Sequence, residues 1–317
     1  MEKAAYAALR PLMMTSFSGP GGSARGGLPT YIGVDAGGSR SRAVLLDASL
    51  RALLARNGAP VNASRLDCAE AARRLGLLIR ELLGQDDAID SPSMISCGVA
   101  GAGTDSCRRE LARALRLELP SAKVHVVADV EAVLESVHPQ PDPVGTVVII
   151  AGTGSIAAGR SALGTFARCG GRGLTTGDPG SGAWFGLRAL RIPSLHERLR
   201  PEAEAAGLGG LQQAASLFPV ILRAAREGEP CALELLAEGA HELAAQAVSV
   251  IRDLGLAGRS FPVALWGGVF RAGPLITGPL SDNIRDSAPG ARLVRPADSP
   301  EVGAVRLAMK EERSESQ

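Results

Sequence analysis

The sequence predicts an α/β protein built of two lobes with a cleft between them. Apolar runs with strand character alternate with runs whose apolar residues recur at helical spacing, which is typical of a partly parallel sheet covered by helices. A proline-rich stretch at residues 138–145 interrupts this order near the middle of the chain. A strand–glycine turn–strand unit stands on each side of that stretch, at 31–46 and at 146–160, which indicates two lobes of one design.

The first lobe is expected at residues 30–140. Its first strand-like run leads into Asp35 and then through Gly37 and Gly38 into a second apolar run. The segment 69–83 places apolar residues on one side and charged residues on the other, which predicts an amphipathic helix. The expected strands are 31–34, 41–46, 94–100 and 124–128, and the expected helices are 69–83, 106–117 and 130–137.

The second lobe is expected at residues 144–317. Proline lacks an N–H group and restricts the residue before it, so the prolines within 138–145 indicate a linker. Beyond the linker, a helical insertion rich in Ala, Leu and Glu is expected at about 192–260, and a strand at 263–266. A terminal helix at 301–311 is expected to pack back on the first lobe.

The composition argues against several classes of protein. Lys+Arg 34 against Asp+Glu 33 leaves no surplus charge to attract nucleic acid or an anionic membrane. No apolar run approaches the roughly 18–20 residues that a membrane span requires. The 5 cysteines are isolated and lack CxxC spacing, which disfavours disulfides, structural zinc or an iron–sulfur cluster and fits a reducing cytoplasm. Residues 1–29 contain no sustained apolar segment and are expected to be a disordered extension.

Two glycine-rich turns follow the first strand of each expected lobe. They are Gly37-Gly38-Ser39 and Gly152-Thr153-Gly154-Ser155. Successive glycines in a tight turn expose backbone N–H groups that hold an anion, and only glycine lets a phosphate approach so closely. Two facing turns would grip a polyphosphate from both sides, with the three hydroxyls as added donors. The alternative is a pair of ordinary hairpin turns, because Gly and Ser are frequent there too. Neither turn has the Walker or the Rossmann pattern.

Two aspartates stand where strands of the first lobe end. Asp35 lies beside the predicted phosphate site, where Mg²⁺ bound through water would offset its repulsion by phosphate. The alternative for Asp35 is an aspartate that accepts hydrogen bonds from the turn. Asp129 ends a strand just before a helix, so it is a candidate for a general base or for a helix N-cap, while Glu131 complements the helix dipole.

The stretch 169–190 holds six glycines between residues 170 and 182. Asp178-Pro179-Gly180 has the composition of a β-turn. So dense a run of glycines favours a ligand-binding loop, in which Asp178 would accept hydrogen bonds from sugar-like hydroxyls. Gly267 and Gly268 follow the strand 263–266, where missing side chains would leave a flat slot for a planar base.

Together these residues resemble the N-acetylglucosamine kinase branch of the BadF/BadG/BcrA/BcrD ATPase family, within the superfamily of actin-like ATPases, sugar kinases and heat-shock ATPases. The likeness spans roughly residues 31–308 and rests on several motifs in a fixed order. The motifs are "GVDAGGSRSRAVLLD", "GAPVN", "GVAGAG", "VVIIAGTGSIAAGR", "CGGRGLTTGDPGSGAWFGLRAL", "LWGGVF" and "PEVGAVRLA".

The resemblance implies two RNase H-like lobes that close on Mg-ATP, with an amino sugar deep in the cleft, and it suggests a homodimer. It places Asp129 at the family's catalytic aspartate. The implied sugar contacts are Asn62, Asp129, Thr153, Gly170, Gly171 and Asp178, the implied phosphate contacts are Gly37, Gly38 and Ser39, and the implied adenosine contacts are Gly267 and Gly268. The chain departs from the family pattern at Ser39, where Thr is usual, and at Arg172 and Pro179, which border the sugar pocket.

The predicted activity is therefore ATP-dependent phosphorylation of an amino sugar, with N-acetylglucosamine phosphorylated at its 6-hydroxyl. Glucosamine and N-acetylmuramate remain alternatives, because the residues around an N-acetyl group cannot be placed from one sequence. An ATPase activator of a 2-hydroxyacyl-CoA dehydratase, which holds an iron–sulfur cluster between subunits, is supported only by the cysteines of "CGVAGAG" and "CGGRG". The presence of both Asp35 and Asp129 disfavours a catalytically silent sugar sensor. The lack of clustered cysteines disfavours a zinc-containing ROK kinase.

Overall fold

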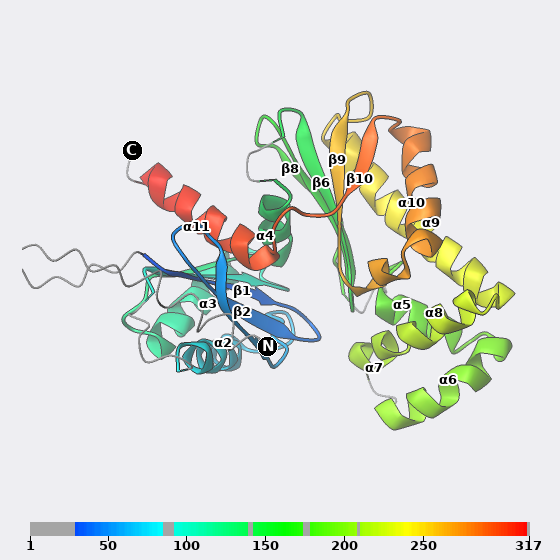
Figure 1. Ribbon diagram of the computed structural model, residues 1–317, viewed down its shortest axis with the longest axis horizontal. Coiled ribbons are helices and arrows are strands. Elements are labelled where there is room, and N and C mark those ends of the chain that lie inside the picture. The colour runs from blue at the N-terminus through cyan, green and yellow to red at the C-terminus, as the bar shows by residue number, and fades with distance from the viewer. Residues whose placement is uncertain (1–28, 85–91, 139–141, 174–177, 208–209, 316–317) are drawn as a thin grey trace, which may run out of the picture.

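Residues 29–84, 92–138, 142–173, 178–207 and 210–315 are described by the computed structural model (Figure 1). They form two five-stranded sheets, in the orders β3-β2-β1-β4-β5 and β10-β9-β6-β7-β8. In each sheet three successive strands run antiparallel and two later strands add in parallel beside the first of them. The two sheets therefore share one strand order, and the prediction of two like α/β lobes is confirmed.

The first sheet is covered by helices on both faces. On one face, Ile32 and Val34 of β1 pack in a core with Leu75 of α2 and Leu111 of α3. The other face is covered by α4 and by α11, which arrives from the far end of the chain (Figure 1). The elements are β1 (Tyr31–Ala36), β2 (Ser41–Leu46), β3 (Ala52–Gly58), α2 (Cys68–Leu83), β4 (Met94–Val99), α3 (Asp105–Glu118), β5 (Val124–Ala128), α4 (Asp129–Ser136) and α11 (Pro300–Glu315).

The second sheet shares one large core with the helices inserted between β8 and β9. Phe185 of α5 and Leu243 of α9 are fully buried in this core beside Val147 and Ile149 of β6. The elements are β6 (Gly145–Ala151), β7 (Ser155–Ser161), β8 (Phe166–Gly170), α5 (Gly182–Ala189), α6 (Pro193–Ala206), α7 (Leu211–Ser216), α8 (Phe218–Arg226), α9 (Pro230–Asp253), β9 (Phe261–Trp266), η2 (Gly268–Ala272), α10 (Pro274–Ser287) and β10 (Ala291–Val294).

Helix α4 joins the two lobes. Its residues Val133 and Leu134 belong to a cluster with Val148 of β6 and Ala158 of β7, on the face of the second sheet opposite the large core. Helix α11 packs so closely against α4 that a Cβ at Gly303 would lie 2.0 Å from the carbonyl oxygen of an α4 residue. The N-terminus of α4 is thus held between both sheets.

Helix α11 is anchored on the first sheet. Ser96 of β4 donates a hydrogen bond from Oγ to Ala304 O (2.7 Å), and Val305 packs with Val44 and Leu46 of β2. The chain therefore leaves the second sheet after β10 and returns to the lobe in which it began.

Three strands were not among those expected from the sequence, and all three lie at sheet edges. β3 is an edge of the first sheet, and β8 and β10 are the two edges of the second. The burial pattern of β3 is largely exposed, and β10 has only four residues. Edge strands bury little surface, so their sequences lack the apolar run on which the prediction depends.

Among the residues that the structure describes, no helix has the length and hydropathy needed to cross a membrane.

Candidate active site

The two glycine turns meet in the cleft between the sheets. Hydrogen bonds close both of them, from Gly37 N across the β1–β2 turn (2.9 Å) and from Gly152 N to Gly154 O in the β6–β7 turn (2.9 Å). A methyl group placed on Gly38 would lie 3.9 Å from Cβ of Thr153. The turns thus lie together, as the sequence predicts, close enough to contact one polyphosphate from both sides.

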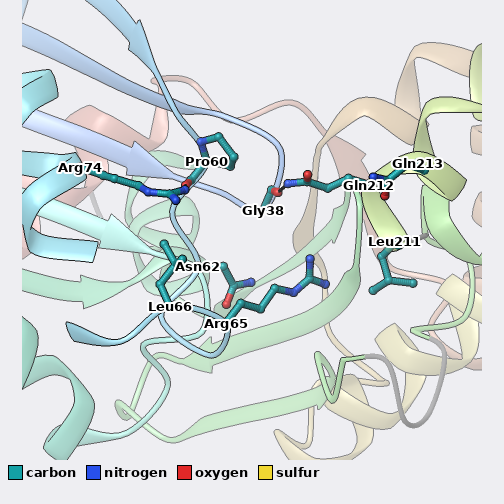
Figure 2. Close-up of a pocket in the computed structure, with 10 residues that line it drawn as sticks. Gly38, Pro60, Asn62, Arg65, Leu66, Arg74, Leu211, Gln212 and Gln213 are labelled. Atoms are coloured by element: carbon teal, nitrogen blue, oxygen red, sulfur yellow. Dashed lines mark hydrogen bonds between the residues drawn. The ribbon is translucent and has the colours of Figure 1, made fainter. Parts of the chain in front are cut away.

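A cavity of about 270 Å³ opens next to the β1–β2 turn (Figure 2). Gly38, Asn62 and Arg65 line it from the first lobe, and Gln212 of α7 lines it from the helical insertion. Gln212 Nε2 also donates a hydrogen bond to Gly38 O, which links the insertion to the phosphate turn. Arg65 and Gln212 could not be selected from the sequence, because neither lies in a glycine motif or at a strand end.

Asn62 presents a free donor to this cavity. Its Oδ1 accepts hydrogen bonds from Ser64 N (2.9 Å) and Ser64 Oγ (2.6 Å), which fixes the orientation of the amide. Its Nδ2 would lie 4.0 Å from a Cβ on Gly38. Gly101 has a φ of 81°, and a Cβ there would lie 2.5 Å from Asn62 Oδ1. Gly101, the second glycine of "GVAGAG", is therefore required by the placement of Asn62.

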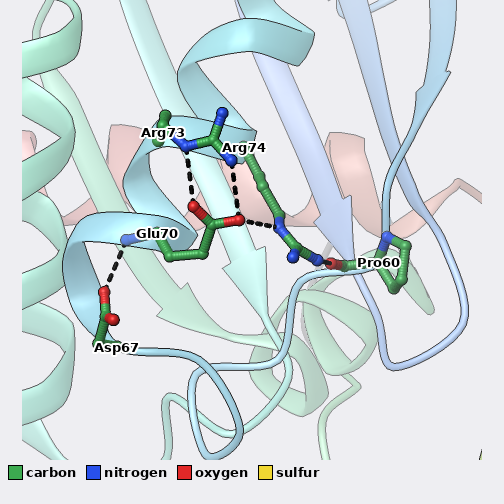
Figure 3. A network of polar contacts seen from close by, with 5 residues as sticks. All are labelled: Pro60, Asp67, Glu70, Arg73 and Arg74. Carbon is green, nitrogen blue, oxygen red and sulfur yellow. Dashed lines mark hydrogen bonds and ion pairs between the residues drawn. The ribbon is translucent and has the colours of Figure 1, made fainter.

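The segment before Asn62 is held by the first turns of α2 (Figure 3). Arg74 donates one hydrogen bond to Pro60 O (3.0 Å) and another to Glu70 Oε1 (2.6 Å). Asp67 caps α2 by accepting a hydrogen bond from Glu70 N (2.7 Å). The helix cap, the ion pair and the loop therefore form one network that positions the cavity wall.

Asp35 and Asp129 flank β4, near the carboxyl ends of β1 and β5. Asp35 is in register with Gly98, and a Cβ on Gly98 would lie 3.7 Å from Cα of Asp129. A residue without a side chain thus separates the two carboxylates. Both aspartates are partly exposed, so both are reachable from the cleft.

The N-cap alternative for Asp129 is wrong. Ala128 is the N-cap of α4 and Asp129 is the first helical residue, whose Oδ1 accepts a hydrogen bond from Val130 N (2.9 Å). Glu131 contributes more than a charge near the helix dipole, because it accepts a hydrogen bond from Ala128 N (3.3 Å) and pairs with Arg108 (2.7 Å).

The environment favours the protonated form of each site carboxylate. Burial, followed by the nearby charges of Glu301 and Asp129, raises the pKa of Asp35 to about 7. Burial also raises the pKa of Asp129, against the opposing effect of backbone N–H groups. Burial likewise raises the pKa of Asp178. A carboxylate that is easily protonated suits a group that must take a proton during a reaction.

Asp178 is 8% exposed and lies against the second glycine turn. Its Oδ1 accepts hydrogen bonds from the N atoms of Arg172 and Gly173 (both 3.1 Å), and its Oδ2 would lie 2.6 Å from a Cβ on Gly154. The predicted β-turn is present, since Ser181 N donates to Asp178 O (3.1 Å). Asp178 has a φ of 35°, an uncommon conformation for a residue other than glycine. Residues 174–177 of this loop lie outside the described residues.

Gly170 and Gly171 are required by the local packing. Their φ angles are 84° and 66°, which disfavour any residue with a side chain. A Cβ on Gly170 would lie 2.3 Å from Gln246 Oε1, and one on Gly171 would lie 2.8 Å from Cδ1 of Ile156. These two glycines therefore let the loop approach β7 and α9.

The sequence predicts that the Ser155 hydroxyl faces a phosphate, but in the structure this hydroxyl contacts other parts of the protein. Ser155 is 2% exposed, and its Oγ donates a hydrogen bond to Pro179 O (2.7 Å) and accepts one from Gln246 (3.3 Å). Its side chain therefore supports the turn that carries Asp178. Ser39 is exposed in the β1–β2 turn.

Gly267 and Gly268 lie beside the second turn and have different surroundings. Gly267 has a φ of 118°, and a Cβ there would lie 2.3 Å from Ala151 O, so no larger residue fits. A Cβ on Gly268 or on Gly152 would meet no atom within 4 Å. Open space therefore adjoins the end of β9 where the sequence predicts a slot for a planar base.

The donor set around Asp35 is suited to Mg²⁺ bound through water. Within the described residues, no group of three or more His, Cys, Asp or Glu side chains forms a metal cage. Mg²⁺ keeps several waters and is typically bound by one or two carboxylates together with substrate phosphates. Asp35, beside a turn suited to phosphate and free of hydrogen bonds from the described residues, meets that requirement.

Two RNase H-like lobes with paired glycine turns in the cleft define a protein of the actin-like ATPase and sugar kinase fold. The chain belongs to the BadF/BadG/BcrA/BcrD ATPase family, whose sequence pattern matches residues 32–308.

Related proteins agree with this assignment. An N-acetylmuramic acid/N-acetylglucosamine kinase of Clostridium acetobutylicum is 26% identical over 304 residues, which cover 88% of this chain and 98% of the relative. An N-acetyl-D-glucosamine kinase of Dictyostelium discoideum is 26% identical over 316 residues, covering 89% and 98%.

Solved structures share the fold. A candidate N-acetylglucosamine kinase of Chromobacterium violaceum aligns with a TM-score of 0.71 and 25% identity, over 88% of this chain and 99% of that one. A ROK family glucokinase of Streptomyces griseus, in complex with glucose and AMPPNP, aligns with a TM-score of 0.64 and 19% identity, over 90% and 100%.

Proposed function

We propose that this protein is an ATP-dependent kinase that phosphorylates N-acetylglucosamine at the 6-hydroxyl. The observation that carries the proposal is the approach of two glycine turns to one another in a cleft that also holds two aspartates of raised pKa. The family assignment and the printed activities of the two related kinases support the same activity.

Phosphoryl transfer depends mainly on positioning and on stabilising charge, and the proposed roles follow from that requirement. The backbone N–H groups at Gly37 and Gly38 and in the facing turn orient the phosphates. Asp129 accepts the proton of the sugar hydroxyl that attacks the terminal phosphate. Mg²⁺, when bound near Asp35, supplies positive charge against the phosphate oxygens.

The sugar is proposed to lie between Asn62 and Asp178, with Thr153, Gly170 and Gly171 also bordering it. Asn62 offers the donor Nδ2, and Asp178 offers carboxylate oxygens held by backbone N–H groups. The adenosine is assigned to the open space next to Gly267 and Gly268. A sugar hydroxyl can both accept and donate a hydrogen bond, so a donor on one side of the sugar and an acceptor on the other suit it.

N-acetylmuramate is the second candidate acceptor, and Arg65 is the observation that favours it. Arg65 lines the cavity beside Asn62, near enough to Asp178 for its charge to lower the pKa of that carboxyl. Figure 2 shows its side chain extending toward α7, and it forms no ion pair among the described residues. An arginine with free donors suits the carboxylate that distinguishes N-acetylmuramate from N-acetylglucosamine.

Coupled ATP turnover with N-acetylglucosamine, glucosamine, N-acetylmuramate and no sugar, each with and without Mg²⁺, tests these proposals. We expect turnover that requires both an N-acetylated amino sugar and Mg²⁺. Selective loss of N-acetylmuramate turnover in Arg65→Gln would assign that acceptor to Arg65. Equal sugar-independent ATP hydrolysis in every reaction would contradict a kinase.

The activator of a 2-hydroxyacyl-CoA dehydratase receives no support from Cys97, the cysteine of "CGVAGAG". Cys97 is fully buried in the first core, and burial raises the pKa of its thiol to about 12. Such a thiol is neither accessible nor readily ionised for binding a cluster at a subunit interface. We further propose a cytoplasmic homodimer, which light scattering would test.

A further inference from the structure

Glu301 is an almost fully buried carboxylate next to Asp35. It lies in the first turn of α11 and is 2% exposed. Glycine is required at position 33 of β1 because a Cβ there would lie 2.1 Å from Glu301 O. Residues 33 and 35 point to the same face of the strand. Glu301 and Asp35 are therefore neighbours on the face of the sheet that α11 covers.

Arg42 is the cation shared by these two carboxylates. It is in register with Asp35 on the adjacent antiparallel strand. Side chains directly opposed in this way have Cβ atoms about 4.5–5.5 Å apart, and opposite charges attract across the pair. Arg42 nevertheless donates its hydrogen bond to Glu301 Oε1 (2.8 Å), and no described residue donates one to the Asp35 side chain.

We propose that Glu301 is a positioning residue that holds Arg42 away from Asp35, so that the Asp35 carboxylate stays free for hydrated Mg²⁺. Without Glu301, the arginine opposite Asp35 would form an ion pair with it and compete with the metal. This inference rests on the proposed function, because it assigns a partner to the residue that faces Mg²⁺.

A second observation indicates that the Arg42–Glu301 pair is more than a structural ion pair. Oε2 of Glu301 is buried and has no hydrogen-bond partner in the described part of the chain. An unpaired buried oxygen carries a desolvation cost, and a buried ion pair seldom stabilises a fold more than apolar packing would. Stability therefore does not account for this carboxylate, whereas control of the charge opposite Asp35 does.

The test compares Glu301→Gln, Arg42→Gln and the double variant. Glu301→Gln preserves shape and releases Arg42, so the Mg²⁺ concentration for half-maximal turnover should rise about fivefold or more, with a smaller change in kcat. A second readout is independent of turnover. In Glu301→Gln, the further increase in Tm that Mg²⁺ causes in ADP-bound protein should be smaller than in the wild type. The increase in Tm that ADP alone causes in EDTA should be unchanged.

The double variant decides between positioning and simple damage to the fold. With Arg42 also replaced, the cation that Glu301 held is gone and only the charge of Arg40, present in every variant, still acts on Asp35, so the Mg²⁺ dependence should return to within about twofold of the wild type. Arg42→Gln alone should lower Tm, because it leaves Glu301 buried without a partner, yet keep the wild-type Mg²⁺ dependence. The matched control is Glu135→Gln, which removes another ion pair between α11 and the first lobe, the one with Lys310.

Three results would overturn the inference: an unchanged Mg²⁺ dependence in Glu301→Gln, a double variant as impaired as the single one, or a raised Mg²⁺ requirement in Arg42→Gln. The last result is informative even if Glu301→Gln fails to fold. Failure of the proposed function is separate, since it would appear as wild-type protein without Mg²⁺-dependent sugar phosphorylation.

Discussion

Asp35 and Asp129 are both carboxylates of raised pKa, yet their surroundings differ in a way that supports different proposed roles. Asp129 opens a helix and accepts a hydrogen bond from Val130 N, so its orientation is fixed toward the cleft end of β5. No described residue donates such a bond to Asp35, which is subject to the charges of two carboxylates and two arginines: Glu301, Asp129, Arg40 and Arg42. A fixed carboxylate suits proton transfer, and an unbonded one suits contact with a hydrated cation.

Asp129→Asn should remove turnover while preserving the fold. Asparagine is nearly isosteric but cannot take the proton, so kcat should fall by about a hundredfold to ten-thousandfold. Steady-state kinetics and nucleotide binding measured by calorimetry check this expectation. The control is Asp105→Asn, which changes the first residue of another helix, α3, on the exposed surface. Turnover close to wild type would exclude Asp129 as the base.

Asp35→Asn should stabilise the metal-free protein at high pH while impairing activity. The folded-state pKa of Asp35 is raised from 3.8 to about 7, so the folded state binds the proton more tightly than the unfolded state. Ionising Asp35 therefore costs stability, and this cost grows as pH rises from about 4 to about 7 and is constant above that.

Asparagine removes the cost, so the variant should be more stable than the wild type by about 1–3 kcal/mol near pH 8. The gain should vanish below about pH 3, because Asp35 is then largely neutral in both the folded and the unfolded state. Urea denaturation in EDTA at several pH values measures the difference. A gain that is independent of pH would show that Asp35 is not the titrating group.

At the scale of elements, the sequence was informative where burial is strong. β1, β4 and β5 are flanked by other strands or covered by helices, and their apolar runs predicted them. The edge strands β3, β8 and β10 were missed because nearly all of their residues are exposed or only partly buried. The glycine turns were recognised because glycine is required where a chain reverses or where another atom lies in the place of a Cβ.

The candidate site was predictable only where it lies within a local motif. Asp35, Asp129 and Asp178 each stand beside a strand end or a glycine run, and Asn62 was indicated only by the family resemblance of "GAPVN". Glu301 reaches the site through the return of α11 to the first sheet, which is a long-range contact with no local pattern. Arg65 and Gln212 likewise became candidates only when the structure placed both on one cavity.

Gly101→Ala should displace Asn62 and weaken sugar binding. The φ of 81° strains any side chain, and the new Cβ would lie 2.5 Å from Asn62 Oδ1. We expect the KM for the sugar to rise about tenfold, with the KM for ATP nearly unchanged. Gly164→Ala is the matched control, because Gly164 has a φ of 85° but no atom within 4 Å of the added Cβ. Equal effects of both variants on sugar KM would contradict this role.

At the scale of the molecule, the lobes are joined through α4 and held by α11. Asp129, the proposed base, begins the helix that packs on both sheets, so its position depends on how the lobes sit relative to one another. The cavity is lined by residues of the first lobe and of the inserted helix α7, and Thr153 of the second lobe lies next to its residue Gly38. The geometry of the site is therefore a property of the assembled lobes rather than of either lobe alone.

Val148→Ala should loosen this joint, whereas Val147→Ala should not. Both residues lie on β6 and are fully buried, but Val148 faces α4 and Val147 faces the large core of the second lobe. Each change should cost about 1–3 kcal/mol of stability. Only Val148→Ala should lower kcat and separate the unfolding of the lobes into two calorimetric transitions. Identical thermograms and kcat values would show that the joint lies elsewhere.

The return of α11 to the first sheet has a consequence for biosynthesis. Val44 and Leu46 emerge from the ribosome early, but the helix that covers them is translated only after Pro300. In a chain that stops before that point, the apolar face of β2 next to Asp35 stays exposed and Glu301 is missing. We expect such truncated chains to be more susceptible to proteolysis, and the end of the cleft that holds Asp35 is completed only at the final stage of translation.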